Sequence, residues 1–573
     1  MNTTTETTRL QTTRDLLDLR ADDHRPGLLF EGRIWTWAEV VAECRIRANL
    51  LLALHEEGRP FHVGVMLEND PEYIFAIGAA AYAGAAVVGI NLTRRGEELA
   101  RDIRYTDCEI LITNAELEAY FNGVPSGVEE CKTLRIATPQ YAEQLAEYRR
   151  FPAPDVEAAG DPRTILLLLF TSGSTGDPKA VICTTGRLYR TAAFRHMGLG
   201  SDDVSYNSMP LFHGNGIFAC WANPLYTGGA FALARKFSAS GFLPDVMRYK
   251  ATYFNYVGRS LSYLLAQPEK PQERQTKLES CFGTEASELD MVEFARRFGI
   301  WPTENYGASE GGLTLRRTPE TPAGSLGLPP EGMDAAVVDP QTMTECPRAV
   351  LSDTGRILNA EEAIGELVNL TGAPLFEGYY KNPEAVAERI RGNAFLTGDL
   401  AYRDEKGFFY FAGRTSDKLR VDSENFSAAP VERVLSRYPG VMLAAVYPVP
   451  DARTGDQVMA TLQMEDPDGF DPASFAAFLE AQPDLGTKWA PRFLSVVKEV
   501  PVTATQKISK PTLRKSAWLV NETVYHRPGR GITFERLDQQ AMEELEALFE
   551  QNGRAHLLPL RPASSNTKEK ETV

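Results

Sequence analysis

The sequence lacks the features of a secreted or disulfide-stapled protein. Its seven cysteines are scattered along 573 residues, without a CxxC pair and without metal-ligand spacing to a histidine. This usage argues against a disulfide framework and indicates reduced thiols in the cytoplasm. Residues 1–20 contain no apolar core of the kind that a secretory signal requires, and we interpret them as a short disordered lead.

Positive charge is also in short supply. Lysine and arginine total 60 against 77 aspartates and glutamates, which gives a formal net charge of −17. That balance argues against nucleic acid or an anionic membrane as a general partner, so any phosphate site must be local. We therefore expect no nucleic-acid partner and no integral membrane association, which leaves peripheral membrane contact and the oligomeric state open.

An uncharged stretch at residues 74–90 raises the question of a membrane span. It is shorter than a spanning helix and rich in alanine and glycine, which makes it only weakly hydrophobic. Its pattern instead predicts a buried helix that turns at Gly84 into a short strand.

The rest of the chain is organised as layers of helix and strand. Short apolar segments such as residues 62–67, 165–170 and 335–339 alternate with helical patterns, which is typical of an α/β fold. Near Gly398 the sequence pattern changes to hairpin-like segments, and the residues that follow are predicted to form a compact α+β lobe. We predict a large multi-sheet N-terminal domain (1–414), a small C-terminal lobe (415–530), and a C-terminal helix with a disordered tail (531–573).

One loop carries the strongest chemical signal. The segment LFTSGSTGDPKAV, residues 169–181, follows an apolar strand and combines glycines, hydroxyls and a lysine. Glycines let backbone N–H groups approach phosphate oxygens, and Lys179 adds positive charge. It is no Walker A loop, because no GK[ST] closes it, and a plain surface turn seldom follows a wholly apolar strand. The predicted phosphate contacts are Thr171, Ser172, Gly173, Ser174, Thr175, Gly176 and Lys179.

This loop resembles the signature of the adenylate-forming (AMP-binding) superfamily of acyl-CoA synthetases, adenylation domains and luciferases. Further segments resemble that family's motifs and occur in its order: MPLFHGNG (209–216), ENYGASEGG (304–312), FLTGDLAYRDEKGFFYFAGR (395–414) and PVTATQKISK (501–510). The resemblance runs from about Leu29 to Lys515. It implies a carboxylic acid:CoA ligase that uses ATP with Mg²⁺, passes through an acyl-AMP, and takes coenzyme A as co-substrate.

The resemblance also assigns nucleotide-binding roles. Tyr306 offers a flat face for adenine, and Glu310 is a hard oxygen ligand suited to Mg²⁺ on ATP phosphates, although a helix-initiating turn would also explain SEGG. Asp399 can accept both ribose hydroxyls, whereas a bare TGD turn would need only a cap. The segment Gly283-Thr284-Glu285-Ala286 occupies the place of the family's adenine-binding loop, and we call it the adenine loop. The remaining nucleotide contacts that the resemblance implies are Gly283, Thr284 and Glu285 in this loop, with Gly307, Ser309 and Arg414.

Two further residues resemble the family's reacting groups. Lys507 matches the adenylation lysine, whose cation spans the attacking carboxylate and the α-phosphate, while Lys510 and Lys515 would be solvated neighbours. His213 resembles the residue that gates the acyl pocket and orients the carboxylate, and a purely structural histidine stays open as the alternative.

Some positions depart from the family pattern. In the family the C-terminal lobe is mobile and rotates about a hinge, which here is Ser416 in place of aspartate or lysine. Ser423 stands where relatives place glycine, and TQK replaces TGK. These departures bear on thioester formation and leave two alternatives open: a ligase that loads a carrier protein, or a degenerate non-catalytic homologue.

The C-terminal segments point to a branch of the family. SENFSAAPVE, TATQKISKPTLRK and VYHRPGRGITFERL resemble the very-long-chain acyl-CoA synthetase and fatty-acid-transport branch. That resemblance implies a lipophilic acid with a long-chain, branched or steroid-like skeleton.

Overall fold

The computed structural model divides into two compact units. It describes residues 10–171, 179–194, 198–318, 320–352, 357–414, 418–421, 424–453, 456–483, 485, 488–503, 507–520, 522–529 and 531–559. Unit 1 comprises Met1–Asp334, Asn369–Leu396 and Ala504–Gln506, and unit 2 comprises Ala335–Val368, Thr397–Thr503 and Lys507–Val573. These units are defined by contacts within the chain. The domain boundary predicted at Arg414, with a mobile lobe after it, remains a prediction.

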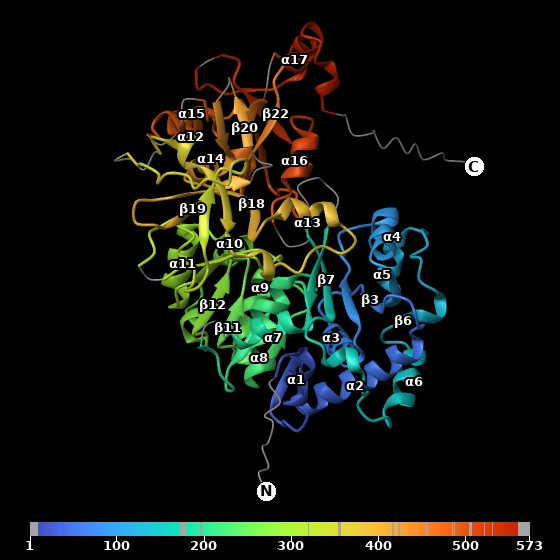
Figure 1. Cartoon of the computed structure of the whole chain (residues 1–573). Coiled ribbons are helices and arrows are strands. Elements are labelled where there is room, and N and C mark those ends of the chain that lie inside the picture. The colour runs from blue at the N-terminus through green and yellow to red at the C-terminus, as the bar shows by residue number, and fades with distance from the viewer. Residues whose placement is uncertain are drawn as a thin grey trace, which may run out of the picture. The chain divides into compact units, whose positions relative to one another are not determined.

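Mainly parallel sheets form the frame of unit 1 (Figure 1). One sheet runs in the order β6-β5-β3-β4-β7-β8, and the other in the order β14-β13-β12-β11-β9-β10-β1-β2. The strands of the first are β3 (His62–Val65), β4 (Ala86–Gly89), β5 (Cys108–Thr113), β6 (Thr133–Arg135), β7 (Ile165–Thr171) and β8 (Lys179–Thr184). Those of the second are β1 (Pro26–Phe30), β2 (Arg33–Thr36), β9 (Val204–Asn207), β10 (Ala230–Leu233), β11 (Tyr253–Asn255), β12 (Ser280–Gly283), β13 (Thr303–Gly307) and β14 (Thr314–Arg316). Thr171, Gly283 and Gly307 end three parallel strands, and ligands of α/β folds bind at such carboxyl ends.

The helices of unit 1 include the buried one predicted from the uncharged stretch. α3 (Pro71–Ala83) starts at the N-cap Asp70, whose side chain accepts from the Glu72 N–H, and every residue of the helix is buried. It ends at Gly84, whose φ of 70° suits glycine, and β4 follows as predicted. The other helices are α1 (Thr13–Asp18), α2 (Trp37–Leu54), α4 (Gly96–Tyr105), α5 (Ala115–Glu118), α6 (Pro139–Tyr148), α7 (Thr185–Ala193), α8 (Ala222–Thr227), α9 (Ala239–Tyr249), α10 (Gly258–Leu265), α11 (Glu288–Phe298) and α13 (Pro383–Arg389).

The N-terminal lead differs from the expectation of disorder. α1 opens with a capping box between Thr12 and Asp15, and Leu16 and Leu17 are fully buried. The expectation was wrong from Thr13 onward because two adjacent leucines suffice to anchor one short capped helix. Residues 1–9 lie outside the described part of the chain.

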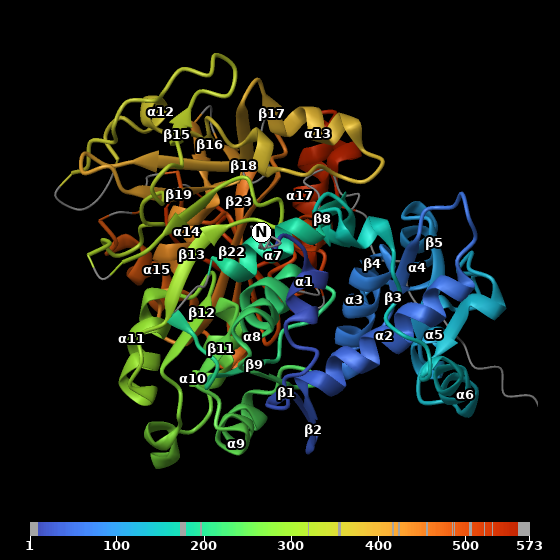
Figure 2. The same cartoon turned by 60° about the horizontal axis from the view of Figure 1, so that its bottom comes forward.

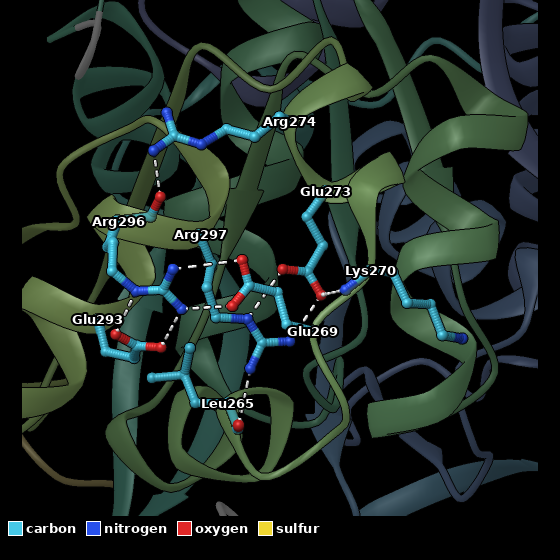
Figure 3. A network of polar contacts seen from close by, with 8 residues as sticks. All are labelled: Leu265, Glu269, Lys270, Glu273, Arg274, Glu293, Arg296 and Arg297. Atoms are coloured by element: carbon cyan, nitrogen blue, oxygen red, sulfur yellow. Dashed lines mark hydrogen bonds and ion pairs between the residues drawn. The ribbon is translucent and has the colours of Figure 1, made fainter.

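An ion-pair network fixes α11, which follows the predicted adenine loop (Figure 3). Arg297 and Glu273 are each 4% exposed and form two parallel bonds, of 2.6 and 2.8 Å. Arg297 also donates to the Leu265 carbonyl at the end of α10. Buried charges persist only when fully paired, so this network ties α10, the 3-10 turn η6 (Pro271–Gln275) and α11 together.

Unit 2 is an α+β assembly. Its strands include β15 (Ala335–Val338), β16 (Gly365–Asn369), β18 (Ala394–Arg403), β19 (Phe409–Arg414), β20 (Lys418–Val421), β21 (Glu424–Ser427), β22 (Val441–Pro450), β23 (Asp456–Met464), β24 (Phe493–Val497), β25 (Thr523–His526) and β26 (Glu535–Arg536). The short β17 (Ile390–Arg391) belongs to unit 1 and pairs there with the first two residues of β18. Its helices include α12 (Ala360–Ala363), α14 (Ala428–Leu435), α15 (Pro472–Glu480), α16 (Lys510–Ser516) and α17 (Gln539–Gln551) (Figure 2). Residues 539–551 form a helix within the segment 531–573, where a C-terminal helix was predicted.

Membrane-spanning helices were not expected. Among the described residues, none of the helices combines the length and the apolar character needed to cross a bilayer.

Candidate active site

The base of the phosphate loop is a tight antiparallel pair. Thr171 ends β7 opposite Lys179, the first residue of β8, and its hydroxyl donates to the Lys179 carbonyl at 3.4 Å. The pair fixes both ends of the loop although residues 172–178 lie outside the described part of the chain. The predicted contacts Ser172, Gly173, Ser174, Thr175 and Gly176 therefore remain predictions.

Lys179 is enclosed by groups from a distant segment. Its residue is 6% exposed, its Nζ lies 3.4 Å from Oε2 of Glu388, and the same Nζ sits 5.4 Å from the centre of the Tyr379 ring. An ammonium over an aromatic face is held by the ring quadrupole, more strongly when it is shielded from water. The orientation of the Lys179 ammonium is thus set by two side chains that lie some 200 residues further along the chain.

Glu310 meets the same tyrosine. The Tyr379 hydroxyl donates to Oε1 of Glu310 at 2.8 Å, and the guanidinium of Arg187 on α7 donates to the carbonyl of the neighbouring Ser309. Burial raises the pKa of Tyr379, and the Glu310 carboxylate raises it further, so the hydroxyl remains a donor. The structure therefore brings Lys179 and Glu310 together on Tyr379, a residue that sequence reasoning missed.

The predicted adenine loop leaves β12 at a glycine that the packing requires. A Cβ on Gly283 would lie 2.3 Å from the Tyr256 ring, so no larger residue fits there. The Thr284 carbonyl accepts from the Gly258 N–H at 2.7 Å, and Glu285 is exposed with a φ of 69°. The loop is held by its backbone while its side chains stay accessible.

A buried carboxylate lies under this loop. Glu304 is 9% exposed, and its Oε1 accepts from the Ala286 N–H at 2.8 Å and from the Tyr256 hydroxyl at 3.3 Å. Burial raises the pKa of Glu304 to about 7, against an ordinary value of 4.5. Sequence reasoning missed Glu304, although it stands two residues before the predicted adenine contact Tyr306, which lies partly exposed at the end of β13 with Gly307.

His213 stands at the entrance to an unusual helix. Its ring lies 4.6 Å from that of Phe212, and a π-helix, η5 (Asn215–Trp221), follows two residues later. Within η5, Asn215 accepts from the amide of Asn255 at the end of β11 at 2.6 Å. A π-helix carries a wider turn and often marks a functional site, so this position suits the predicted acyl gate.

In unit 2 the TGD turn is held firmly. The Gly398 N–H donates to Oε1 of Glu366 at 2.8 Å, the Thr397 hydroxyl donates to the Leu367 carbonyl at 2.6 Å, and the Asp399 N–H donates to the Thr397 hydroxyl at 3.1 Å. Asp399 is partly exposed and lies opposite Arg414 in the β18–β19 pair. The fixed backbone presents the carboxylate that we predict to bind ribose.

Lys507 in unit 2 is anchored through its backbone. Its N–H donates to the Thr503 hydroxyl at 3.2 Å and its carbonyl accepts from the Thr503 N–H at 2.7 Å. Lys510 differs from the solvated neighbour that we expected, because its Nζ lies 2.8 Å from Glu432 and its side chain is only 20% exposed. The predicted hinge, Ser416, lies outside the described residues.

The donor set of Glu310 fits Mg²⁺. The carboxylate is partly exposed, and the Tyr379 hydroxyl contacts one oxygen, Oε1. No group of three or more ligating side chains is assembled among the described residues, and Mg²⁺ on nucleotide phosphates characteristically takes only one or two carboxylates. The fold and this grouping of a cation, a carboxylate and the predicted adenine loop are those that an adenylate-forming enzyme requires.

Known proteins support that class. A family model described as AMP-binding enzyme matches residues 19–380. The chain is 48% identical over 559 residues to the steroid-22-oyl-CoA synthetase of Rhodococcus jostii, with 96% of this chain and 100% of that protein covered. It is 42% identical over 503 residues to a medium/long-chain-fatty-acid–CoA ligase of Mycobacterium tuberculosis, with 87% and 95% covered. The chain belongs to the AMP-binding enzyme family.

Solved structures agree on the fold. ATP-bound MatB from Rhodopseudomonas palustris superposes with a TM-score of 0.74 at 24% identity, covering 88% of this chain and 98% of that one. An anthranilate CoA ligase in complex with anthranoyl-AMP gives 0.75 at 23% identity, covering 89% and 97%. The predicted α/β multi-sheet fold and the predicted class of AMP-forming acid–thiol ligase, with ATP, Mg²⁺ and coenzyme A, are confirmed.

Proposed function

We propose that this protein joins a steroid side-chain carboxylic acid to coenzyme A in an ATP-dependent reaction that passes through an acyl-AMP. The observation that carries the activity is the convergence of Lys179 and Glu310 on Tyr379 within unit 1. A cation and a hard oxygen ligand at one place match a polyphosphate and its metal ion. Mg²⁺, when bound, offsets the negative charge of the phosphates.

The chemistry assigns a role to each candidate residue. A carboxylate oxygen of the acid attacks the α-phosphorus of ATP, the bond to the bridging oxygen breaks, and pyrophosphate leaves. Lys507 stabilises the anions that approach in this step, Asp399 holds the ribose, and His213 orients the carboxylate. The sulfur of coenzyme A then attacks the acyl carbonyl as a thiolate, and AMP leaves with the bonding electrons.

The class of acid rests on similarity along the whole chain. At 48% identity over 96% of the chain, a relative is named for a steroid-22-oyl group, which is a lipophilic acid. A medium- or long-chain fatty acid is the second candidate, because the fatty-acid ligase is 42% identical over 87% of the chain. We place the enzyme in the cytoplasm, since its cysteines are unpaired in the described part of the chain.

The test is acid-dependent exchange between ATP and labelled pyrophosphate, with AMP release measured after coenzyme A is added. A steroid acid with its carboxyl on the side chain should give the highest kcat/KM, followed by a long-chain fatty acid and then acetate. Steady formation of ADP would exclude the acyl-AMP route. Transfer to a phosphopantetheinyl carrier protein but not to coenzyme A would support the carrier-loading alternative, and no exchange with any acid would support a degenerate homologue.

A further inference from the structure

Tyr379 contacts two candidate residues of the nucleotide site, although it lies in none of the motifs that predicted the site. We propose that Tyr379 is a positioning residue: its hydroxyl orients the Glu310 carboxylate toward Mg²⁺, and its ring directs the Lys179 ammonium toward the phosphates. The inference rests on the proposed roles of Glu310 and Lys179.

The backbone around Tyr379 is fixed by the sheet. The Ile182 N–H donates to the Gly378 carbonyl at 3.0 Å, the Tyr380 N–H donates to the Ala180 carbonyl at 2.8 Å, and Tyr379 itself bridges to Val181. The segment therefore runs antiparallel to β8, the strand that begins at Lys179. The position of Tyr379 is therefore fixed by its pairing with β8, the strand that directly follows the phosphate loop.

The hydroxyl group of Tyr379 orients the Glu310 carboxylate through a hydrogen bond. The bond to Oε1 is 2.8 Å long, and the Arg389 guanidinium also faces the hydroxyl. A hydroxyl that donates to one carboxylate oxygen limits rotation of the group and leaves the other oxygen for a metal ion. Mg²⁺ accepts little departure from octahedral geometry, so groups that orient its ligands strongly influence its affinity.

The ring itself acts on Lys179. The ammonium lies 5.4 Å from the ring centre, and Tyr379 is only 4% exposed. Phe376 packs edge-on against the tyrosine at 5.0 Å, and Phe395 packs against Phe376 at 5.3 Å. This aromatic cluster keeps the ring in place, so the two functions of Tyr379 can be separated by removing the hydroxyl alone.

The experiment measures metal binding apart from turnover. Mn²⁺ is titrated into full-length protein saturated with α,β-methylene-ATP, and free Mn²⁺ is read by electron paramagnetic resonance. Tyr379→Phe should weaken Mn²⁺ about 10-fold, the scale of a hydrogen bond to a charged group, with metal-free nucleotide affinity kept within about 2-fold. The matched control is Tyr380→Phe, which removes the adjacent hydroxyl and its 2.6 Å bond to Asp107 and should leave both affinities unchanged.

Two further variants separate the outcomes. Tyr379→Leu removes the ring as well and should lower metal-free nucleotide affinity by a further ~3-fold. In a Glu310→Gln background, Tyr379→Phe should have no additional effect on Mn²⁺ affinity. Equal Mn²⁺ affinity in the wild type and Tyr379→Phe, equal losses in Tyr379→Phe and Tyr380→Phe, or additive effects with Glu310→Gln would each overturn the proposal. If no acid supports pyrophosphate exchange while Tyr379→Phe alone weakens Mn²⁺, the proposed function fails and the role of Tyr379 stands.

Discussion

The candidate residues of unit 1 and those of unit 2 are held in different ways. In unit 1, Lys179 and Glu310 are oriented by side chains 209 and 69 residues away in sequence. In unit 2, the backbone of Lys507 is bonded to Thr503, four residues earlier, and Asp399 stands in a hairpin with its partner strand. Distant side chains orient the two unit 1 residues directly. In unit 2, Lys507 is held by a local backbone contact, and Asp399 by a strand pair whose turn is also bonded to Glu366 and Leu367.

This difference matches the two kinds of task that the proposed reaction sets. Phosphates and metal need a rigid platform, because electrostatic stabilisation depends on groups that do not reorganise during the reaction. A residue needed in only one half-reaction can instead stand on a locally closed element, whose shape does not depend on contacts made elsewhere. The contrast therefore predicts that unit 1 substitutions affect both half-reactions through the nucleotide, and that Lys507 affects one.

The largest expected effect is that of Lys507→Ala. Loss of one preorganised cation at the reacting centre should lower acyl-AMP formation by about 10² to 10³. Thioester formation from supplied acyl-AMP and coenzyme A should persist. Pyrophosphate exchange and single-turnover thioester assays measure the two steps separately.

The control for Lys507 is Lys515→Ala rather than the Lys510 variant. Lys515 is exposed, whereas Lys510 pairs with Glu432, which also accepts from the Val446 N–H, so its loss would disturb the fold. Lys515→Ala should match the wild type in both assays. Equal loss of both half-reactions in folded Lys507→Ala protein would contradict the comparison.

Asp399→Ala should act next most strongly. Removing a charged acceptor for ribose hydroxyls should raise the KM for ATP by about 10- to 100-fold, with less effect from Asp399→Asn. Asp404→Asn in the same hairpin is the control, because Asp404 supports the turn by accepting from the Phe408 N–H at 2.8 Å. Asp404→Asn should lower the melting temperature and leave the KM for ATP unchanged. An unchanged KM in Asp399→Ala would show that the TGD segment is only a structural turn.

The sequence predicted those parts of the site that depend on local order. The strand before the phosphate loop and the buried helix ending at Gly84 have the predicted conformations, and the motifs named Lys179 and Glu310 as candidates, because strand, cap and motif signals lie in neighbouring residues. Tyr379 and Glu304 could not be found, since their roles arise from side-chain contacts across 69 and 48 residues. Neither the aromatic pair after Gly378 nor a glutamate two residues before an aromatic carries a local sign of these partners.

Glu304→Gln tests whether the adenine loop, like Lys179 and Glu310, is held by a buried side chain of unit 1. The folded pKa of about 7 lies above the ordinary 4.5, so this carboxyl contributes stability below pH 4.5 that is lost as pH rises through 7. Tyr256, Arg317 and Glu285 are the charged or titratable groups that face it. A neutral amide accepts the same bonds, so the melting temperature of the variant relative to the wild type should rise by roughly 2–5 °C between pH 5 and pH 8. Differential scanning fluorimetry across that range measures it, and a constant difference would contradict a buried, titrating Glu304.

Glu388→Gln should have the smallest effect on the KM for ATP. It tests the Lys179–Glu388 ion pair, which is the most exposed of the unit 1 contacts compared above. Glu388 is 63% exposed at the side chain, against 7% for Lys179, and such half-solvated pairs contribute about 0–1 kcal/mol. If Lys179 must turn from this carboxylate toward phosphate, removing the charge should lower the KM for ATP by about 2-fold at low salt, and the gain should fade as ionic strength rises. Glu384→Gln removes an exposed charge one turn earlier on α13 and should change neither value. A raised KM in Glu388→Gln would instead mean that the carboxylate helps the Tyr379 ring to hold Lys179 in its working position, which would extend the rigid platform to the surface of α13.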